Sequence, residues 1–169
     1  MDKREIPTKN YAILVGVILL IICACFAFYN LYNIYQENKV KTSPLATTSI
    51  LYEDLKNATK EIDADTFLVV SYVQDKDVHE SERQIKKLLN KKNLLDNVMY
   101  LDITDYRTEE NFKDDLNKVL KLEGKTIIKE FPAVVYYKDG VPTKTIDSRD
   151  HLLNSNDFAQ MIDSYELAS

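Results

Sequence analysis

The sequence predicts an α/β domain, in which helices flank a mixed sheet, preceded by one transmembrane helix. Three patterns support this prediction: an uncharged apolar stretch near the N-terminus, two β-rich runs separated by an amphipathic helix, and an Asp-Gly pair between two further β-rich runs. Beyond the helix, the chain has room for one ordinary domain of roughly 100–130 residues. We expect a tail at 1–10, the transmembrane helix at 11–29, a tether at 30–45 and the domain at 46–169.

The apolar stretch extends from Tyr11 to Tyr29 without a charged residue. At a helical rise of ~1.5 Å per residue, this length approaches the ~30 Å thickness of the hydrocarbon core of a bilayer. Tyr11 at one end and Tyr29, Tyr32 and Tyr35 at the other resemble the aromatic belts found at headgroup level. Two alternatives stay open: a cleaved signal peptide, because such signals also have a basic start and an apolar run, and a lipoprotein acylated at Cys25.

Basic residues flank the apolar stretch almost evenly. Lys3, Arg4 and Lys9 precede it, and Lys39 and Lys41 follow it. By the positive-inside rule, this small excess favours a cytoplasmic N-terminus. We therefore expect a single-pass protein of the cell membrane whose C-terminal domain is extracytoplasmic.

Charge and cysteine content exclude several function classes for the domain. The chain has a net charge of −5 at pH 7, and an acidic domain is poorly suited to gripping phosphate backbones, so we expect no nucleic-acid partner. Both cysteines, Cys23 and Cys25, lie in the apolar stretch. The predicted domain therefore has no thiol for a disulfide, for dithiol exchange or for a thiolate metal site, and we expect no cofactor.

The domain is expected to begin with an amphipathic helix. Its apolar stripe would be formed by Leu51, Leu55, Ala58 and Ile62. A strand at 66–73 follows, with apolar residues on both of its faces. This pattern is typical of a strand covered on both sides, so we place it at the centre of the sheet.

The next elements predict a parallel strand–helix–strand unit. A helix is expected from Asp77 to about Leu95, and a second strand at 97–103. A crossover of this length implies parallel strands joined in a right-handed sense. Lysines on the helix, at 86, 87, 91 and 92, are interpreted as a solvated face. A further helix is expected from about Thr108, ending at Gly124.

The last third of the chain predicts a hairpin and a closing helix. Asp139-Gly140 separates two β-rich runs, and this pair favours a type I′ turn because both central residues need a positive φ. The two strands should therefore be antiparallel neighbours. In the closing helix, Ser155 or Asn156 is expected to cap the start. Its buried face is expected to comprise Phe158, Met161, Ile162 and Tyr165.

Residues 130–140 run Glu-Phe-Pro-Ala-Val-Val-Tyr-Tyr-Lys-Asp-Gly. An apolar residue, a proline, an apolar strand and a Lys-Asp-Gly turn, together with the order of the elements, resemble the thioredoxin superfamily over roughly residues 46–167. The resemblance implies a thioredoxin-like fold with a cis peptide bond before Pro132. In the alternative interpretation, Pro132 only begins an edge strand.

The chain departs from this family where the central strand meets the next helix. Thioredoxins place Cys-x-x-Cys there, because the helix N-terminus lowers the pKa of the attacking thiol. Here residues 74–81 run Gln-Asp-Lys-Asp-Val-His-Glu-Ser, so oxidoreductase activity is not expected. The resemblance still implies a groove that holds an extended peptide against the residue before the proline. We expect this peptide-binding groove to comprise Asp77, Val78, His79, Phe131 and Pro132.

Three functions fit these patterns. The first is a redox-inactive, membrane-tethered domain that binds a polypeptide partner in an envelope or export process, similar to accessory proteins of bacteriocin export in Gram-positive bacteria. The second is a structural assembly subunit of a membrane complex. The third is a metal-dependent hydrolase that uses His79 with Asp75, Asp77 and Glu80. Because no nucleophile–base pair or metal-ligand spacing is recognisable, we expect no enzyme, no catalytic residue and no metal site.

Overall fold

The computed structural model describes residues 8–62 and 64–165. The chain divides into two compact units, Met1–Lys39 and Val40–Ser169, and most of the predicted tail at 1–10 lies outside the described residues. Helix α1 (Thr8–Lys39) belongs to the first unit. Its stretch Asn10–Tyr35 has a mean hydropathy of 2.9 and is, by length and composition, able to cross a membrane.

The predicted tether at 30–45 is not a separate segment. Its first part, to Lys39, continues α1, and from Val40 onwards the chain belongs to the second unit. Val40 and Leu45 are buried, and the Val40 carbonyl accepts a hydrogen bond from the Gln74 N–H at 2.9 Å. Two isolated apolar residues in a polar stretch show no periodicity, so the sequence pattern does not reveal that they are buried.

The second unit contains a five-stranded mixed sheet with the strand order β1-β3-β2-β4-β5. The strands are β1 (Ser49–Ile50), β2 (Thr66–Ser71), β3 (Val98–Asp102), β4 (Ala133–Lys138) and β5 (Val141–Asp147). β1, β3 and β2 are parallel, whereas β4 pairs antiparallel with both β2 and β5. The central place of β2 and its parallel pairing with β3 confirm those two predictions, while β1 was not predicted.

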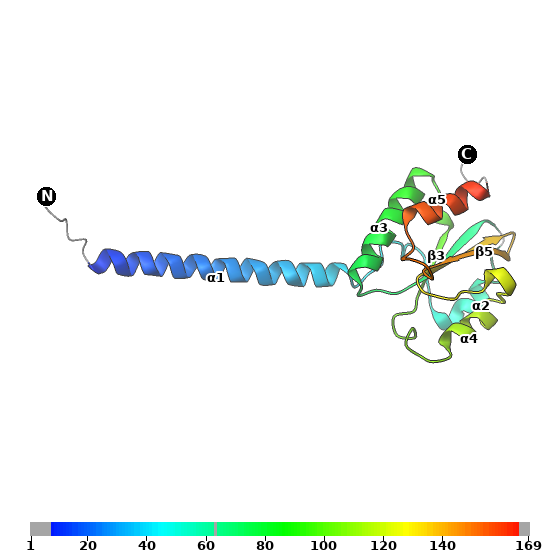
Figure 1. Ribbon diagram of the computed structural model, residues 1–169, viewed down its shortest axis with the longest axis horizontal. Coiled ribbons are helices and arrows are strands. Elements are labelled where there is room, and N and C mark those ends of the chain that lie inside the picture. Colours follow the sequence, from blue (N-terminus) through cyan, green and yellow to red (C-terminus); the bar gives the residue numbers. More distant parts are fainter. Residues whose placement is uncertain (1–7, 63, 166–169) are drawn as a thin grey trace. The chain divides into compact units, whose positions relative to one another are not determined.

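Helices cover both faces of this sheet. They are α2 (Leu55–Ala58), α3 (Lys76–Lys91), α4 (Phe112–Val119) and α5 (Ser155–Ser164), with short 3₁₀ helices η1 (Tyr52–Asp54), η2 (Leu95–Asn97) and η3 (Gly124–Thr126). α3 and α5 lie on one face, and α2 and α4 on the other (Figure 1). The predicted class, a mixed sheet flanked by helices, is therefore confirmed.

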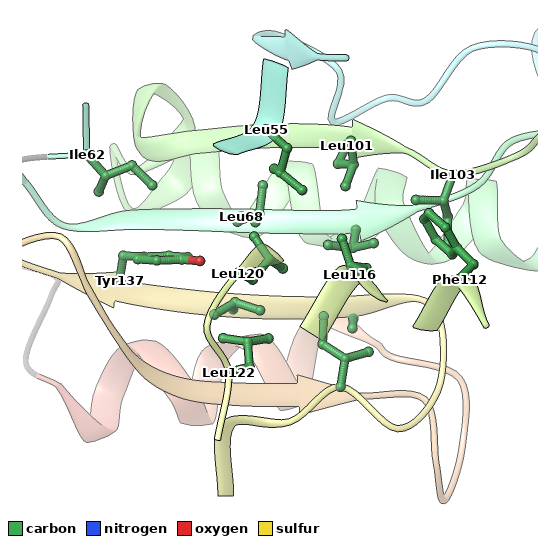
Figure 2. Close-up of a cluster of buried hydrophobic side chains, with 14 residues drawn as sticks. Leu55, Ile62, Leu68, Leu101, Ile103, Phe112, Leu116, Leu120, Leu122 and Tyr137 are labelled. Carbon is green, nitrogen blue, oxygen red and sulfur yellow. The ribbon is translucent and has the colours of Figure 1, made fainter. Parts of the chain in front are cut away.

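The core lies on both faces of the sheet because successive strand residues point to opposite sides. In β2, Phe67 and Val69 pack into a cluster with residues of α3 and α5. Leu68 and Val70 pack into a second cluster with residues of α2 and α4 (Figure 2). Burying a side chain of this size is worth about 1.5–3 kcal/mol, so β2 stabilises both layers at once.

The first predicted helix is wrong in extent. The chain is helical only over η1 and α2, and Leu51 precedes them in an extended conformation with its side chain 68% exposed. Leu55 is buried in the helix, while Ile62 is buried from the segment that follows it. The spacing of the apolar residues predicted a longer amphipathic helix, but α2 ends after one turn.

The predicted end of α4 at Gly124 is also wrong. α4 ends at Val119, and Lys121 adopts a positive φ of 55° immediately after it. The Leu122 N–H bonds to the Asn117 carbonyl at 2.9 Å and the Lys121 N–H bonds to the Lys118 carbonyl at 3.1 Å, which is the Schellman pattern. Lys121 occupies the C-terminal position of the helix that glycine usually takes, so the pattern wrongly predicted an end at Gly124, the next glycine in the sequence.

The hairpin prediction is confirmed. Asp139 and Gly140 both have positive φ, 51° and 75°, between the antiparallel strands β4 and β5. A Cβ at Gly140 would lie 2.6 Å from the Ile62 carbonyl oxygen, so the position requires glycine for space as well as for φ. The cap of α5 differs from the prediction: Asn154, one residue earlier, accepts from the N–H groups of Asn156 and Asp157.

Candidate functional site

The start of α3 is the first half of the predicted groove. The Asp75 carboxylate caps the helix by accepting from the Asp77 N–H at 2.9 Å and the Val78 N–H at 3.1 Å. Gln74, just before it, has a positive φ of 67°. Because Asp75 accepts from these amide groups, the positive end of the α3 dipole is already paired with a carboxylate of the chain itself.

The predicted residues on this turn point in different directions. Asp77 is exposed and His79 is partly buried. Val78 is 2% exposed and therefore packs into the interior, so its side chain does not line a surface groove. The sequence pattern alone could not tell the inward-pointing residue of this turn from the outward-pointing ones.

The loop before β4 is the second half of the predicted groove. The Phe131–Pro132 peptide bond is cis. The Pro132 carbonyl is occupied, since it accepts from the Ser148 N–H at 3.0 Å and from the Ser148 hydroxyl at 2.9 Å. By contrast, no hydrogen bond involves the Phe131 N–H or carbonyl within residues 8–62 and 64–165. This residue therefore keeps a backbone donor and acceptor available for another chain.

Tyr72 follows β2 and packs against the same buried cluster as Phe131. The Arg107 guanidinium is 4.1 Å from the centre of the Tyr72 ring, an arrangement that stacks a cation on an aromatic face. Burial, followed by the Asp75 carboxylate, raises the pKa of the Tyr72 hydroxyl, while the Arg107 cation opposes the rise.

Aromatic rings extend this surface beyond the predicted groove. Tyr106 and Phe112 have ring centres 5.5 Å apart in a stacked arrangement, and the Phe131 ring lies 6.1 Å from that of Phe112. The Lys113 ammonium bonds to the Lys129 carbonyl at 2.6 Å and to the Glu130 carboxylate at 3.1 Å. We call Tyr72, Tyr106, Arg107 and Phe131 the aromatic edge.

Sequence reasoning missed Tyr72, Tyr106 and Arg107. A usable signal was present, because Tyr72 directly follows β2 and Tyr106 and Arg107 come shortly after β3. The carboxyl ends of parallel strands meet at one edge of a sheet, where ligands bind in open α/β folds. The predicted pairing of the two strands was therefore enough to bring these side chains together.

A buried carboxylate lies at the end of β2. Glu82 of α3 is 3% exposed. Its Oε1 accepts from the Ser71 hydroxyl at 2.5 Å and from Tyr100 at 3.4 Å, and its Oε2 accepts from the Ser43 hydroxyl at 2.5 Å. Burial raises the pKa of Glu82, while the hydroxyl donors oppose the rise. The network joins the segment after α1, the end of β2 and the helix α3.

Within the described residues, no group of three or more His, Cys, Asp or Glu side chains is placed to hold a metal ion. The other histidine, His151, bonds through Nε2 to the Asp157 carboxylate at 2.9 Å, next to the cap of α5. The arrangement presents aromatic rings, the cations of Arg107 and Lys113, and the backbone N–H and carbonyl of Phe131, which are unpaired among the described residues.

The strand order and pairing directions now identify the architecture, since three parallel strands are followed by an antiparallel hairpin that starts at a cis-proline. The fold is thioredoxin-like. The chain matches no protein-family model, and no curated protein is similar to it in sequence.

Solved structures of thioredoxin-fold proteins are similar to the chain. Oxidised thioredoxin O2 from Arabidopsis thaliana has a TM-score of 0.45 at 10% identity, over 70% of this chain and 95% of that one. Chloroplastic thioredoxin z has a TM-score of 0.45 at 14% identity, over 72% and 95%. A protein described as a putative oxidoreductase with a thioredoxin fold has a TM-score of 0.45 at 16% identity, over 70% and 97%. The fold assignment stands on the strand order and pairing directions.

Proposed function

We propose that this chain is a membrane-tethered thioredoxin-like protein that binds an extended polypeptide in an envelope or export process and performs no thiol chemistry. The observation that supports this most is the unpaired backbone of Phe131 beside a cis-proline, within the aromatic edge. A free N–H and C=O on one residue can pair with an extended chain, as in strand addition. Aromatic and arginine side chains around it supply the contacts that dominate polypeptide recognition.

Three further observations fit the proposal. The chain's cysteines, Cys23 and Cys25, both lie in α1, so no thiol stands at the start of α3. α1 is long and apolar enough to act as the anchor, and the basic residues around it favour an extracytoplasmic domain. We place the protein in an export process because its sequence resembles accessory proteins of bacteriocin export in Gram-positive bacteria.

Site-specific photo-crosslinking would test the binding proposal in the cell. A photoreactive phenylalanine analogue replaces Phe131 in the full-length chain in its native membrane. As a control, the same analogue replaces Val141, which is 61% exposed on the hairpin away from the loop. We expect a discrete polypeptide adduct from position 131 and none from position 141.

A second substitution links the adduct to the aromatic edge. Arg107→Ala should reduce the yield of the adduct from position 131 by about tenfold, because hot-spot arginines contribute on the order of 1–2 kcal/mol to an interface. Adducts of equal yield at both positions, or an adduct unaffected by Arg107→Ala, would favour the assembly-subunit function over a peptide groove.

The absence of redox chemistry has its own test. The full chain in detergent micelles should not accelerate the reduction of insulin by dithiothreitol, because no dithiol pair lies in the domain. Acceleration above the rate without protein would contradict the proposal. Elemental analysis of the same sample tests the metal-dependent hydrolase, which requires bound metal.

A further inference from the structure

A second surface lies at the other end of the sheet from the aromatic edge. There a cavity of about 750 Å³ is enclosed by the segment after α2, the end of α4 and the hairpin turn. β4 links the two places, since it begins next to Pro132 and ends next to Asp139. Its six residues at ~3.3 Å each separate them by about 20 Å. The cavity is therefore distinct from the peptide groove.

Lysines from two distant parts of the sequence meet at this cavity. Lys56 and Lys60 come from α2 and the turn after it, and Lys118 and Lys121 from the end of α4. Among the described residues of the lining, Asp139 is the one that is acidic. The described lining residues thus carry an excess of positive charge, whereas the chain as a whole has a net charge of −5.

Helix capping accounts for only part of this cluster. Lys56 and Lys118 lie in the last turns of α2 and α4, where a cation offsets the negative end of the helix dipole. Lys60 and Lys121 lie beyond those turns. Among the described residues only Lys118 of the four forms an ion pair, with Asp115 at 3.0 Å. Lys56, Lys60 and Lys121 therefore have no ion-pair partner among the described residues.

Lys121 occupies a costly backbone position. Its φ of 55° lies in the left-handed region, where a residue with a Cβ costs about 1–2 kcal/mol relative to glycine. The structure places a long cation here rather than glycine. The Schellman turn at the end of α4 therefore places the Lys121 cation at the rim of the cavity.

The floor of the cavity is apolar. Ile62, Leu120 and Tyr137 line the cavity and belong to one cluster of buried hydrophobic side chains (Figure 2). Tyr137 is 2% exposed, and its hydroxyl is the one buried side-chain polar atom in the described chain that has no hydrogen bond. Burial raises the pKa of this hydroxyl, so it keeps its proton.

We infer that this cavity binds a small organic anion with at least two acidic groups, phosphate or carboxylate, on a compact apolar body. The lysines at the rim fit the acidic groups, and the apolar floor fits the body. Its volume lies within the ~300–1,000 Å³ of typical ligand sites. The inference does not rest on the peptide-binding proposal, because no residue of the aromatic edge lines the cavity.

Calorimetric titration of the full chain in zwitterionic nanodiscs tests the inference, with inorganic pyrophosphate and citrate as probes. The double variant Lys60→Gln/Lys121→Gln removes two rim charges, and Lys87→Gln/Lys91→Gln removes the same charge from α3 as a control. We expect saturable binding of at least one probe by the native chain. The rim variant should bind about tenfold more weakly, since charge-assisted hydrogen bonds are lost, and the control variant less than twofold more weakly.

The outcomes separate the site from general electrostatic attraction. Failure of both probes to bind saturably, or an equal loss in the rim and control variants, would overturn the inference. Circular dichroism melting shows that both variants are folded. Nanodiscs that contain phosphatidylglycerol distinguish the source of the anion: weaker pyrophosphate binding there supports a lipid headgroup as occupant, and unchanged binding supports a free small molecule. Adducts at position 131 report on the peptide groove separately.

Discussion

Two buried polar side chains, one near each end of the central strand, are stabilised very differently. Glu82, at the end of β2, accepts hydrogen bonds from the hydroxyls of Ser43, Ser71 and Tyr100. Tyr137, which pairs with the start of β2 and lines the lysine-lined cavity, has no side-chain hydrogen-bond partner among the described residues. An unpaired buried polar group costs about 1–3 kcal/mol. The Glu82 carboxylate is thus fully hydrogen-bonded, while the Tyr137 hydroxyl carries a cost that a mutation can relieve.

The largest effect should come from removing the carboxylate. Glu82→Ala leaves the buried hydroxyls of Ser71 and Tyr100 and the partly buried hydroxyl of Ser43 without this acceptor, and we expect the free energy of unfolding to fall by about 3 kcal/mol. Urea unfolding of the full chain in detergent micelles, followed by tyrosine fluorescence, measures the change. Glu80→Ala, on the exposed side of the same helix, is the matched control and should have little effect. Equal losses in both variants would show that the network is not important for stability.

The next effect concerns the wall of the cavity. Gly140→Ala should lower the free energy of unfolding by about 2–4 kcal/mol, because the new Cβ meets the Ile62 carbonyl in addition to the cost of a positive φ. Gly124→Ala has a similar φ of 57° with open space around its Cβ, and should cost about 1–2 kcal/mol. Unfolding in urea compares the two. If they cost the same, the close contact with Ile62 contributes nothing.

A smaller effect of opposite sign is expected at the unpaired hydroxyl. Tyr137→Phe removes a buried donor that has no acceptor, so stability should stay unchanged or rise by up to about 1 kcal/mol. Tyr136→Phe is a neighbouring control, since its hydroxyl donates to Asp65 at 2.7 Å, and it should lose about 1 kcal/mol. Thermal melting of both variants gives the signs. A loss in Tyr137→Phe would mean that the hydroxyl has a partner.

The smallest effect is a dependence of stability on pH that comes from Glu82. Because the folded state raises the pKa of Glu82 above its ordinary value of 4.5, that state holds the proton more tightly than the unfolded chain does. The contribution of Glu82 is therefore present below pH 4.5 and is lost as the pH rises through the folded-state pKa. Glu82→Gln should flatten this part of the stability profile, and an unchanged slope would assign the dependence to another group.

The sequence predicted the parts of the fold that local signals define. β2 has apolar residues on both faces, and Asp139-Gly140 requires a specific turn, so each could be recognised from a few neighbouring residues. β1 has only two residues, and the Schellman turn carries Lys121 in place of glycine, so neither leaves a local pattern. Val40 and Leu45 are buried only because the domain folds around them.

The sequence predicted where the candidate site lies but not all of the side chains that form it. The proline loop and the start of α3 followed from the resemblance, whereas Tyr72 and Arg107 meet only when the strand ends align. Glu82 was hidden in a charged run, although it lies four residues after Val78 and three before Ile85, on the buried face of α3. The cavity joins lysines about sixty residues apart, and tertiary structure alone brings them together.

The capping of α3 by Asp75 limits any attempt to restore catalysis by grafting cysteines onto this scaffold. A sulfur placed at Asp77 would lie two residues from a carboxylate that already accepts the Asp77 and Val78 amide hydrogens. That negative charge would raise the thiol pKa, where a working oxidoreductase needs it lowered. Asp75 would have to be replaced together with the grafted pair before a reactive thiolate could form.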